Sequence, residues 1–257
     1  MKLICHDDTR FSREFAEGAN APVANIHRKD LVKLKKKGYT VAFTGFGRMK
    51  LIMKLEAHEI PYFFIDRGYI IDDGRKQWMR VSYNSFQMDQ MRDFGSWRRS
   101  IRIKPKKWKK NGDYILVVPP CPKAGKYWGF DNKKWLESTV TELREHSNRD
   151  ILVRARPLVR DRYSGPKSLI NAAKNAHCIV VYNSNAATEA IFHGTPAIVL
   201  GEAASKFVAV QSISQVENLI RPDRTEWVKN LMYNQFTRDE LADGTALKAL
   251  IKMHNLK

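Results

Sequence analysis

The stretch HCIVVYNSNAATEAIFHGTPAIVLG, from His177 to Gly201, decides the fold class. An apolar run stops at Asn183, small residues follow, and a second apolar run covers Pro196 to Leu200. This order predicts a strand, a tight turn, a short helix and a second strand. Apolar runs that do not alternate with polar residues are typical of parallel strands covered by helices on both faces.

The residues before this stretch repeat the same rhythm. Further strands are predicted over 113–118 and 150–156, and further helices over 132–147 and 168–176, with a loop over 119–129. Strands that alternate with helices in this way form a doubly wound α/β domain around a parallel sheet.

The first hundred residues contain one more unit of the same kind. Strands are predicted over 39–43 and 61–68, and a helix over 48–58 joins them, as in a βαβ crossover. A short helix is predicted over 9–19, with Ser12 as its cap.

The tail of the chain predicts two or three helices, of which Asp223 or Thr225 caps the first. The whole pattern divides the chain into an N-terminal α/β domain over 1–110 that ends in a basic linker over 92–110, a second α/β domain over 111–222, and C-terminal helices over 223–257.

The sequence is strongly basic, with 45 lysines and arginines against 27 acidic residues and a formal net charge of +18. Such a charge favours a polyanionic partner, either nucleic acid or an anionic membrane, and the alternative is a basic but otherwise ordinary enzyme. No apolar run is long enough to span a bilayer, and the first residues contain no signal-peptide stretch. We therefore expect a cytoplasmic protein without integral membrane association.

In open α/β sheets, ligands bind at the carboxyl ends of the strands. At these ends the second domain collects cations and a helix start, both of which favour a phosphate group. Glu189 lies about one turn beyond Asn185 on the same side of this helix, and a carboxylate there suits the hydroxyl groups of a ribose. The residues expected around the ligand are Lys123, Lys126, Arg154, Arg156, Arg160, Asn183, Ser184, Asn185 and Glu189.

Each of these residues also has a simpler explanation. Ser184 caps its helix whether or not a ligand binds there. Glu189 is either exposed to solvent or paired with an arginine if it does not contact a ribose. Arg154 and Arg156 alternate along a strand, so only one of them faces a given side of the sheet.

The pattern N-S-N-A-A-x-E-A-x-x-x-G-x-P-x-I over 183–198 resembles the donor-binding helix of GT-B glycosyltransferases. The segments FIDRGYI, VVPPCPKAGKYWG and RTEWVKNLMYNQFTRDELADG, together with the arginine-bearing strand, resemble small proteins of tailed bacteriophages, and this similarity covers most of the chain. The resemblance implies a GT-B-like fold of two Rossmann-like domains, whose parallel sheets face a cleft, with a helical tail. It also implies a glycosyltransferase with a nucleotide-sugar donor, for which a UDP-sugar is the first candidate.

The resemblance also implies roles for single residues. It implies that Glu189 contacts the nucleoside of the donor. The residues that it places around the diphosphate are Asn183, Ser184, Asn185, Lys123 and Lys126, and the two that stabilise the leaving group are Arg154 and Arg160.

A sugar transferase that inverts configuration usually needs a general base beside the acceptor hydroxyl. Asp66 is the strongest candidate because it directly follows an apolar strand, and its alternatives are to cap a turn or to pair with Arg67. Asp7 and His6 are weaker candidates. No D-x-D or H-E-x-x-H spacing is convincing, and the three widely spaced cysteines offer no metal site. We therefore expect a metal-independent mechanism in which arginines stabilise the charge.

The segment from Arg92 to Lys110 holds nine basic residues, one acidic residue and two tryptophans. Its cations suit phosphate groups, and its tryptophans suit unstacked bases. The residues predicted to bind nucleic acid are Arg98, Arg99, Arg102, Lys104, Lys106, Lys107 and Trp108. The alternative is a solvated linker whose tryptophans pack on a domain.

The main hypothesis from the sequence is a glycosyltransferase that moves a sugar to a hydroxymethylated pyrimidine base in phage DNA, as some phage GT-B enzymes do. The first alternative is transfer to a surface glycan or a lipid-linked acceptor, with the basic surface serving an anionic membrane. The second alternative is a GT-B-derived DNA-binding protein without turnover. The patterns carry no information on the oligomeric state.

Overall fold

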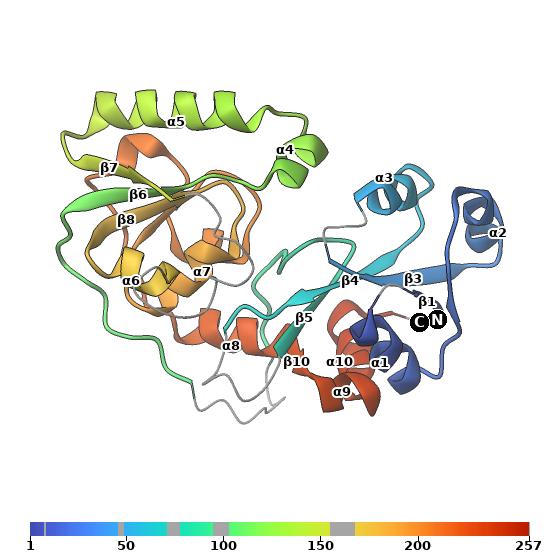
Figure 1. Cartoon of the computed structure of the whole chain (residues 1–257). Helices are drawn as coiled ribbons and strands as arrows, with labels where there is room; N and C mark the ends of the chain where they lie inside the picture. The colour runs from blue at the N-terminus through green and yellow to red at the C-terminus, as the bar shows by residue number, and fades with distance from the viewer. Residues whose placement is uncertain (8, 46–48, 71–77, 95–102, 155–167, 257) are drawn as a thin grey trace. The chain divides into compact units, whose positions relative to one another are not determined.

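A computed structural model describes residues 1–7, 9–45, 49–70, 78–94, 103–154 and 168–256 (Figure 1). The chain forms two compact units. The first comprises Met1–Met88 and Met232–Lys257, and the second comprises Asp89–Leu231. The second unit is therefore an insertion in the chain of the first, which differs from the three consecutive parts predicted over 1–110, 111–222 and 223–257.

The difference has two physical causes. The end of the basic segment is fastened to the second unit, because the amide of Lys106 donates to the carbonyl of Phe192 over 2.9 Å. After helix α8 (Thr225–Tyr233), the chain adds a strand to the sheet of the first unit. The predicted linker thus belongs to one unit, and the predicted tail is shared between both.

A six-stranded sheet forms the centre of the first unit. Its strands, in spatial order, are β10 (Gln235–Thr237), β5 (Trp78–Tyr83), β4 (Tyr62–Arg67), β3 (Tyr39–Thr44), β1 (Lys2–His6) and β2 (Val23–Ala24). Strands β1 to β4 pair in parallel, whereas β5 pairs antiparallel with β4 and β10. The predicted strands over 39–43 and 61–68 are confirmed.

Helices cover both faces of this sheet, as Figure 1 shows. They are α1 (Arg10–Gly18), the short 3-10 helix η1 (Arg28–Asp30), α2 (Leu31–Lys36), α3 (Met49–Ala57), α9 (Arg238–Ala242) and α10 (Thr245–His254). The core on the side of α1, α9 and α10 includes Phe15, Phe63, Phe236 and Leu250, all buried. Burial of such side chains is the main source of stability in a unit of this size.

The start of α1 and the tail correct two predictions. The cap of α1 is Thr9, whose hydroxyl accepts from the amide of Phe11 over 3.2 Å, and Ser12 lies three residues later in a capping box with it. The tail is not purely helical, because Gln235–Thr237 pair as β10 with Trp78–Arg80. A three-residue strand has no recognisable period of its own, and its pairing partner lies far away in the sequence.

The second unit contains a fully parallel sheet in the order β7 (Asp150–Val153), β6 (Tyr114–Val118), β8 (Ala176–Val181) and β9 (Ala197–Val199). Its helices are α4 (Pro122–Trp128), α5 (Asn132–His146), α6 (Leu169–Lys174), α7 (Asn185–Phe192), the 3-10 helices η4 (Ala204–Val208) and η5 (Ile213–Gln215), and most of α8. In Figure 1, α5 lies on one side of this sheet and α6 and α7 lie on the other. The predicted doubly wound α/β domain is confirmed, except that the predicted loop over 119–129 contains α4.

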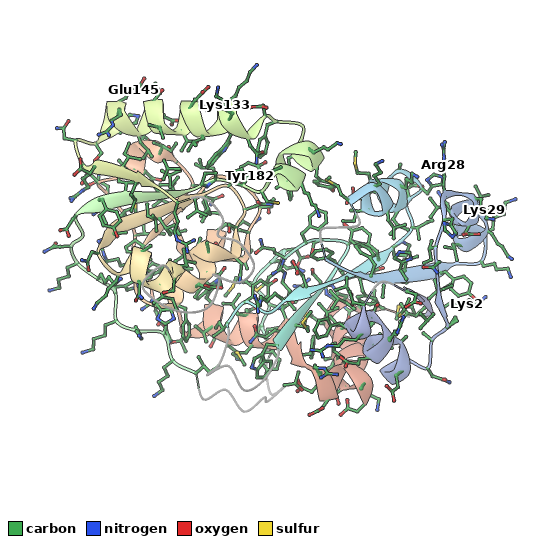
Figure 2. The ribbon with its side chains drawn as sticks, in the orientation of Figure 1. Lys2, Arg28, Lys29, Lys133, Glu145 and Tyr182 are labelled. Atoms are coloured by element: carbon green, nitrogen blue, oxygen red, sulfur yellow. The ribbon has the colours of Figure 1, made fainter. Side chains whose placement is uncertain are left out.

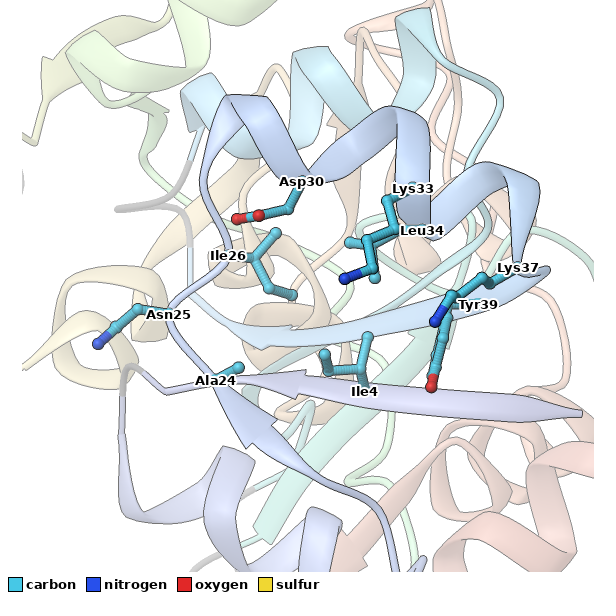
Figure 3. A pocket seen from close by; sticks show the side chains of 9 residues that line it. All are labelled: Ile4, Ala24, Asn25, Ile26, Asp30, Lys33, Leu34, Lys37 and Tyr39. Carbon is cyan, nitrogen blue, oxygen red and sulfur yellow. The ribbon is translucent and has the colours of Figure 1, made fainter.

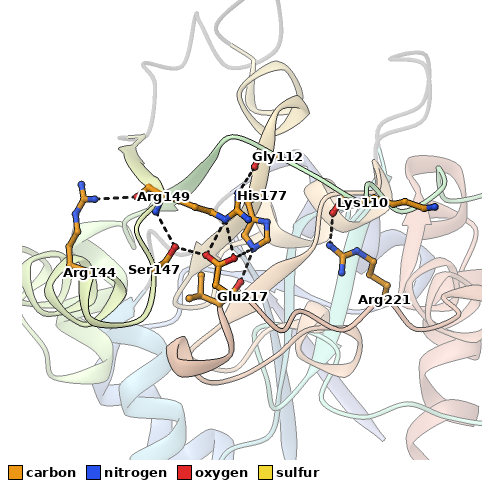
Figure 4. A network of polar contacts seen from close by, with 9 residues as sticks. Lys110, Gly112, Arg144, Ser147, Arg149, His177, Glu217 and Arg221 are labelled. Carbon is orange, nitrogen blue, oxygen red and sulfur yellow. Dashed lines mark hydrogen bonds and ion pairs between the residues drawn. The ribbon is translucent and has the colours of Figure 1, made fainter.

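A polar network fastens the amino edge of this sheet (Figure 4). The carboxylate of Glu217 accepts from the guanidinium of Arg149 over 3.0 Å and from the hydroxyl of Ser147. Arg149 also donates to the carbonyl of Gly112 over 2.8 Å, and the Nε2 of His177 lies 2.8 Å from the carbonyl of Val216. These contacts join the starts of β6, β7 and β8 to the loop after η5.

Within the described residues, no helix combines the length and apolar character that crossing a membrane requires.

Candidate functional site

The second unit has a topological switch point between β6 and β8. After β6 the chain passes to β7 on one side, and the next strand, β8, pairs with β6 on the other side. Crevices form at the carboxyl ends of the strands at such a point, and ligands of open α/β sheets bind there. The segments that reach this edge are the start of α4, which follows β6, and the start of α7, which follows β8.

The start of α7 is built as predicted. The hydroxyl of Ser184 accepts from the amide of Ala186 over 3.2 Å, so Ser184 is the helix cap. Asn183 and Asn185 flank this cap and are half-buried. The cap is therefore established, whereas contact of these three residues with a diphosphate stays a prediction.

Arg154 and Glu189 come together at the same edge. Arg154 directly follows β7, and its amide donates to the carbonyl of Val117 over 2.8 Å. Burial lowers the pKa of the Arg154 guanidinium, and the charge of the Glu189 carboxylate partly opposes this effect. Glu189 thus has an arginine neighbour, which the sequence analysis gave as an alternative to contact with a ribose. The partner positions Arg156 and Arg160 lie outside the described residues.

Lys123 and Lys126 lie on α4 and are exposed. The helix begins after Cys121 with Pro122 in its first turn, and it ends at Gly129, which adopts a left-handed conformation with φ of 76°. Neither lysine forms an ion pair with a carboxylate in the described part of the chain. Contact of either lysine with an anion at the carboxyl end of β6 stays a prediction.

Tyr182 is a residue at this edge that the sequence analysis missed. Its ring lies edge-on to Phe130, with centroids 4.7 Å apart, and to Trp128 at 5.8 Å. Figure 2 labels Tyr182 in the second unit. A Cβ added at Gly201 would lie 2.9 Å from this ring, so only glycine fits there without displacement. Burial, helped by the carboxylate of Glu202, raises the pKa of the Tyr182 phenol.

A sequence signal for Tyr182 does exist. Cys178, Val180 and Tyr182 alternate along one strand, so all three face α5, and the last one reaches the carboxyl edge. An aromatic residue that ends such a run is therefore placed at the carboxyl edge, where its ring packs against Phe130 and Trp128.

The first unit has its own carboxyl edge, and Asp66 lies there at the end of β4. One oxygen of its carboxylate accepts from the guanidinium of Arg80 over 2.7 Å, and the other accepts from the amide of Arg67 over 2.8 Å. The Arg80 side chain is only 8% exposed and also donates to the carbonyls of Arg67 and Phe86. Asp66 is thus held by Arg80 and by the backbone, and its role as a base stays a prediction.

Asp7 lies at the switch point of the first unit, between β1 and β3. Its carboxylate accepts from the guanidinium of Arg13 over 2.7 Å, and this hydrogen bond lowers the pKa of Asp7. The hydroxyl groups of Thr9 and Thr44 are 3.0 Å apart at the same place. His6 is less available, because its Nδ1 accepts from the amide of Ile26 over 3.0 Å. Its position at the switch point therefore makes Asp7 a stronger candidate for the general base than the sequence alone indicated.

The described end of the basic segment is packed rather than free. The indole nitrogen of Trp108 donates to the carbonyl of Pro222 over 2.8 Å, and the guanidinium of Arg224 lies 3.8 Å from the centre of the ring. Lys104, Lys106 and Lys107 are exposed. This geometry matches the alternative in which the tryptophan packs on its domain. Arg98, Arg99 and Arg102 lie outside the described residues.

A hollow of about 300 Å³ lies elsewhere, on one face of the sheet of the first unit (Figure 3). Its lining includes the apolar Ile4, Ile26 and Leu34, with Lys33 and Lys37 at its rim. It adjoins the end of β1, because the amide of its lining residue Ile26 donates to the Nδ1 of His6. Among the described residues, no three histidine, cysteine or acidic side chains gather in a group that is able to hold a metal ion.

Two solved structures from Thermosulfurimonas dismutans are similar to this chain. The first is described as KpsC, beta Kdo 2,7 transferase; it has a TM-score of 0.57 and 14% sequence identity, and the match covers 96% of this chain and 100% of that chain. The second is described as KpsC, beta Kdo 2,4 transferase, with a TM-score of 0.51, 12% identity and 91% coverage of both chains.

The fold is GT-B-like. At such low sequence identity the two structures show this fold and nothing finer, and the predicted fold class is confirmed. No protein-family model matches the sequence, and no curated protein matches it significantly. The resemblance to phage proteins stays a prediction.

Proposed function

We propose that the protein is a glycosyltransferase that binds a nucleotide-sugar at the carboxyl edge of its second unit and transfers the sugar to a hydroxyl group of a glycan. The observation that carries this proposal is the neighbourhood of Arg154 and Glu189 beside the start of α7. A cation, a helix start and a carboxylate together match a phosphate joined to a ribose. The GT-B-like fold, shared with two sugar transferases, supports the same reaction class.

Each group has a defined task in this reaction. The acceptor oxygen forms a bond to the anomeric carbon, the bond from that carbon to the phosphate oxygen breaks, and its electron pair leaves with the nucleotide. Arg154 stabilises the charge that builds up on the leaving phosphate, assisted by Lys123 or Lys126. Glu189 accepts hydrogen bonds from the ribose. The proton of the acceptor hydroxyl passes to a carboxylate, for which Asp66 and Asp7 are the candidates.

A glycan acceptor is better supported than a base in DNA. Both similar structures are described as Kdo transferases, and neither description mentions nucleic acid. Trp108 uses its N–H group and one face of its ring within its own unit, so this tryptophan is a poor platform for an extruded base. The DNA acceptor therefore becomes the second candidate.

The donor test measures binding of UDP, CMP, GDP and their sugar conjugates by calorimetry, with and without EDTA. We expect one nucleotide class to bind without metal, and Glu189→Gln to weaken it at least about tenfold, because a hydrogen bond to a charged group is lost. Glu142→Gln is the matched control, because Glu142 is exposed on α5. Absence of binding by the unaltered protein to every nucleotide in the panel would refute the proposal.

The acceptor test adds the bound nucleotide-sugar to an oligosaccharide mixture and to DNA that contains hydroxymethylcytosine. Mass spectrometry then detects the added sugar. We expect the mass increase on an oligosaccharide. A mass increase on the DNA alone would reinstate the DNA base as acceptor, and binding without any transfer would remove the enzymatic assignment.

A further inference from the structure

The segment that carries Lys104 to Lys110 is fixed to the second unit. The amide of Lys109 donates to the carbonyl of Gly194 over 2.8 Å, three residues after the contact that Lys106 makes with Phe192. Gly194 has a φ of 90°, and a Cβ there would lie 2.2 Å from the carbonyl oxygen of Lys107. This close approach requires glycine and sets the segment firmly against the end of α7.

Two arginines form hydrogen bonds with backbone carbonyls of the segment from Lys104 to Lys110. Arg224 is buried and donates to the carbonyls of Ile191 and Lys106. Arg221 donates to the carbonyls of Lys109 over 2.9 Å and Lys110 over 3.2 Å, and Figure 4 shows the second contact. These carbonyl oxygens are therefore used within the unit, while several basic side chains reach the solvent. We call these exposed side chains the basic ridge; they are Lys104, Lys106, Lys107, Lys110, Lys174 and Arg221.

The charge of the basic ridge is not compensated within the described residues, since none of its side chains forms an ion pair there. On the other side of the same amino edge, Arg149 is compensated by Glu217. The sequence outside the described residues adds more positive charge, because 95–102 has three basic and no acidic residues and 155–167 has four basic and one acidic residue.

The charges of the basic ridge act on neighbouring side chains. Burial lowers the pKa of Lys109, and the charges of Lys106 and Lys174 lower it further. Burial also lowers the pKa of His193, again with help from Lys106 and Lys109. Repulsion among like charges destabilises a fold. A rigidly held and uncompensated positive surface is therefore expected to serve an anionic partner.

Apolar side chains identify the kind of partner. Ile220, which is 45% exposed, directly precedes Arg221, and Ile170, which is 39% exposed, lies one helical turn before Lys174. Exposed isoleucines among cations suit the boundary between headgroups and acyl chains of a membrane. A nucleic acid would instead be served by a free aromatic ring, and Trp108 is engaged in its own unit.

We infer that the basic ridge, with Ile220 and Ile170, is a docking surface for anionic phospholipid headgroups at the amino edge of the second unit. Its ammonium groups contact lipid phosphates, and its isoleucines enter the boundary region. The surface lies at the end of the sheet opposite the candidate donor site, so this inference does not depend on the proposed function.

The test uses flotation with vesicles of phosphatidylcholine alone and of equal parts phosphatidylcholine and phosphatidylglycerol. The ridge variant changes Lys104, Lys106, Lys107 and Lys110 to Gln, and the control variant changes the exposed Lys29, Lys36, Lys50 and Lys134 to Gln. Both lose the same net charge. One basic residue near an anionic membrane contributes about a factor of five to binding, so the ridge variant should bind at least about a hundredfold more weakly than the control.

Three outcomes would overturn the inference. The first is no preference for anionic vesicles, and the second is an equal loss of vesicle binding in both variants. The third is that mixed-sequence duplex DNA binds more tightly than the vesicles and is weakened by the ridge variant but not by the control variant. Ile220→Ser separates the two classes of partner further, because it should weaken vesicle binding and leave DNA binding unchanged. Nucleotide binding measured on the same ridge variant should stay normal, so failure of the donor site would be recognised independently.

Discussion

Arg154 and Glu189 lie in different βα segments, one after β7 and one within α7, and their charges interact at the carboxyl edge of the sheet. Burial lowers the pKa of the guanidinium, and the charge of the carboxylate partly opposes this effect. In the proposed function, a phosphate that enters the site meets a cation that is already placed at this edge. Such preorganisation is what makes a positive charge effective in stabilising a leaving group.

The interaction between these two residues should be visible in a double-mutant cycle. We expect Arg154→Met and Glu189→Gln to be non-additive in urea unfolding by at least about 0.5 kcal/mol, as is common for neighbouring charges. Arg28 is an exposed arginine on η1, and Figure 2 labels it. Arg28→Met combined with Glu189→Gln should be additive. Additivity in both cycles would remove the electrostatic link between Arg154 and Glu189.

Gly201→Ala tests the close contact between Gly201 and the Tyr182 ring. The new methyl group would lie 2.9 Å from the ring, so the ring or the backbone must move. We expect a loss of about 1–3 kcal/mol in the free energy of unfolding, the usual cost of overpacking. Tyr182→Leu in the same chain should recover part of this loss. If Gly201→Ala melts like the unaltered protein, the contact is looser than the structure indicates.

Asp66→Asn should lower the stability of the first unit. It removes the charge that accepts from the buried Arg80, so the free energy of unfolding should fall by about 1–2 kcal/mol. Asp7→Asn breaks an exposed pair with Arg13 and should lower the free energy of unfolding less than Asp66→Asn does.

Transfer by the same variants identifies the base. If Asp66 accepts the proton, Asp66→Asn should lower the rate at least about a hundredfold and leave nucleotide binding intact. A normal rate in this variant, together with a loss in Asp7→Asn, would assign the proton transfer to Asp7.

Glu217 predicts the response of the second unit to acid. Burial alone would raise its pKa, but the hydrogen bonds from Arg149 and Ser147 and the charges of Arg149 and His177 outweigh this effect and lower it from 4.5. The stabilisation is complete above about pH 4.5 and is lost as the pH falls through the lower folded-state pKa. The melting temperature of Glu217→Gln should therefore fall less steeply than that of the unaltered protein as the pH is lowered below 4.5. Parallel melting curves for both proteins would contradict the shift.

The sequence predicted those parts of the fold that local patterns specify. The strands of the second unit are continuous apolar runs, and the cap of α7 is a serine at the expected place, so both were recognised. Contacts between distant residues were not recognisable. The pair of Asp66 with Arg80, the packing of Trp108 under Arg224 and the pairing of β10 with β5 all join residues that carry no mutual signal in the sequence.

The insertion of the second unit has a consequence for synthesis on the ribosome. Residues Asp89–Leu231 leave the exit tunnel as an uninterrupted stretch and contain all four strands of their own sheet. In the first unit, by contrast, the outer edge of β5 has no partner strand until Gln235–Thr237, which form β10, have been synthesised. Until then, β5 exposes unpaired backbone groups of the kind that other chains bind. The segment that is translated second is thus able to fold first, and the earliest residues of the chain complete their sheet last.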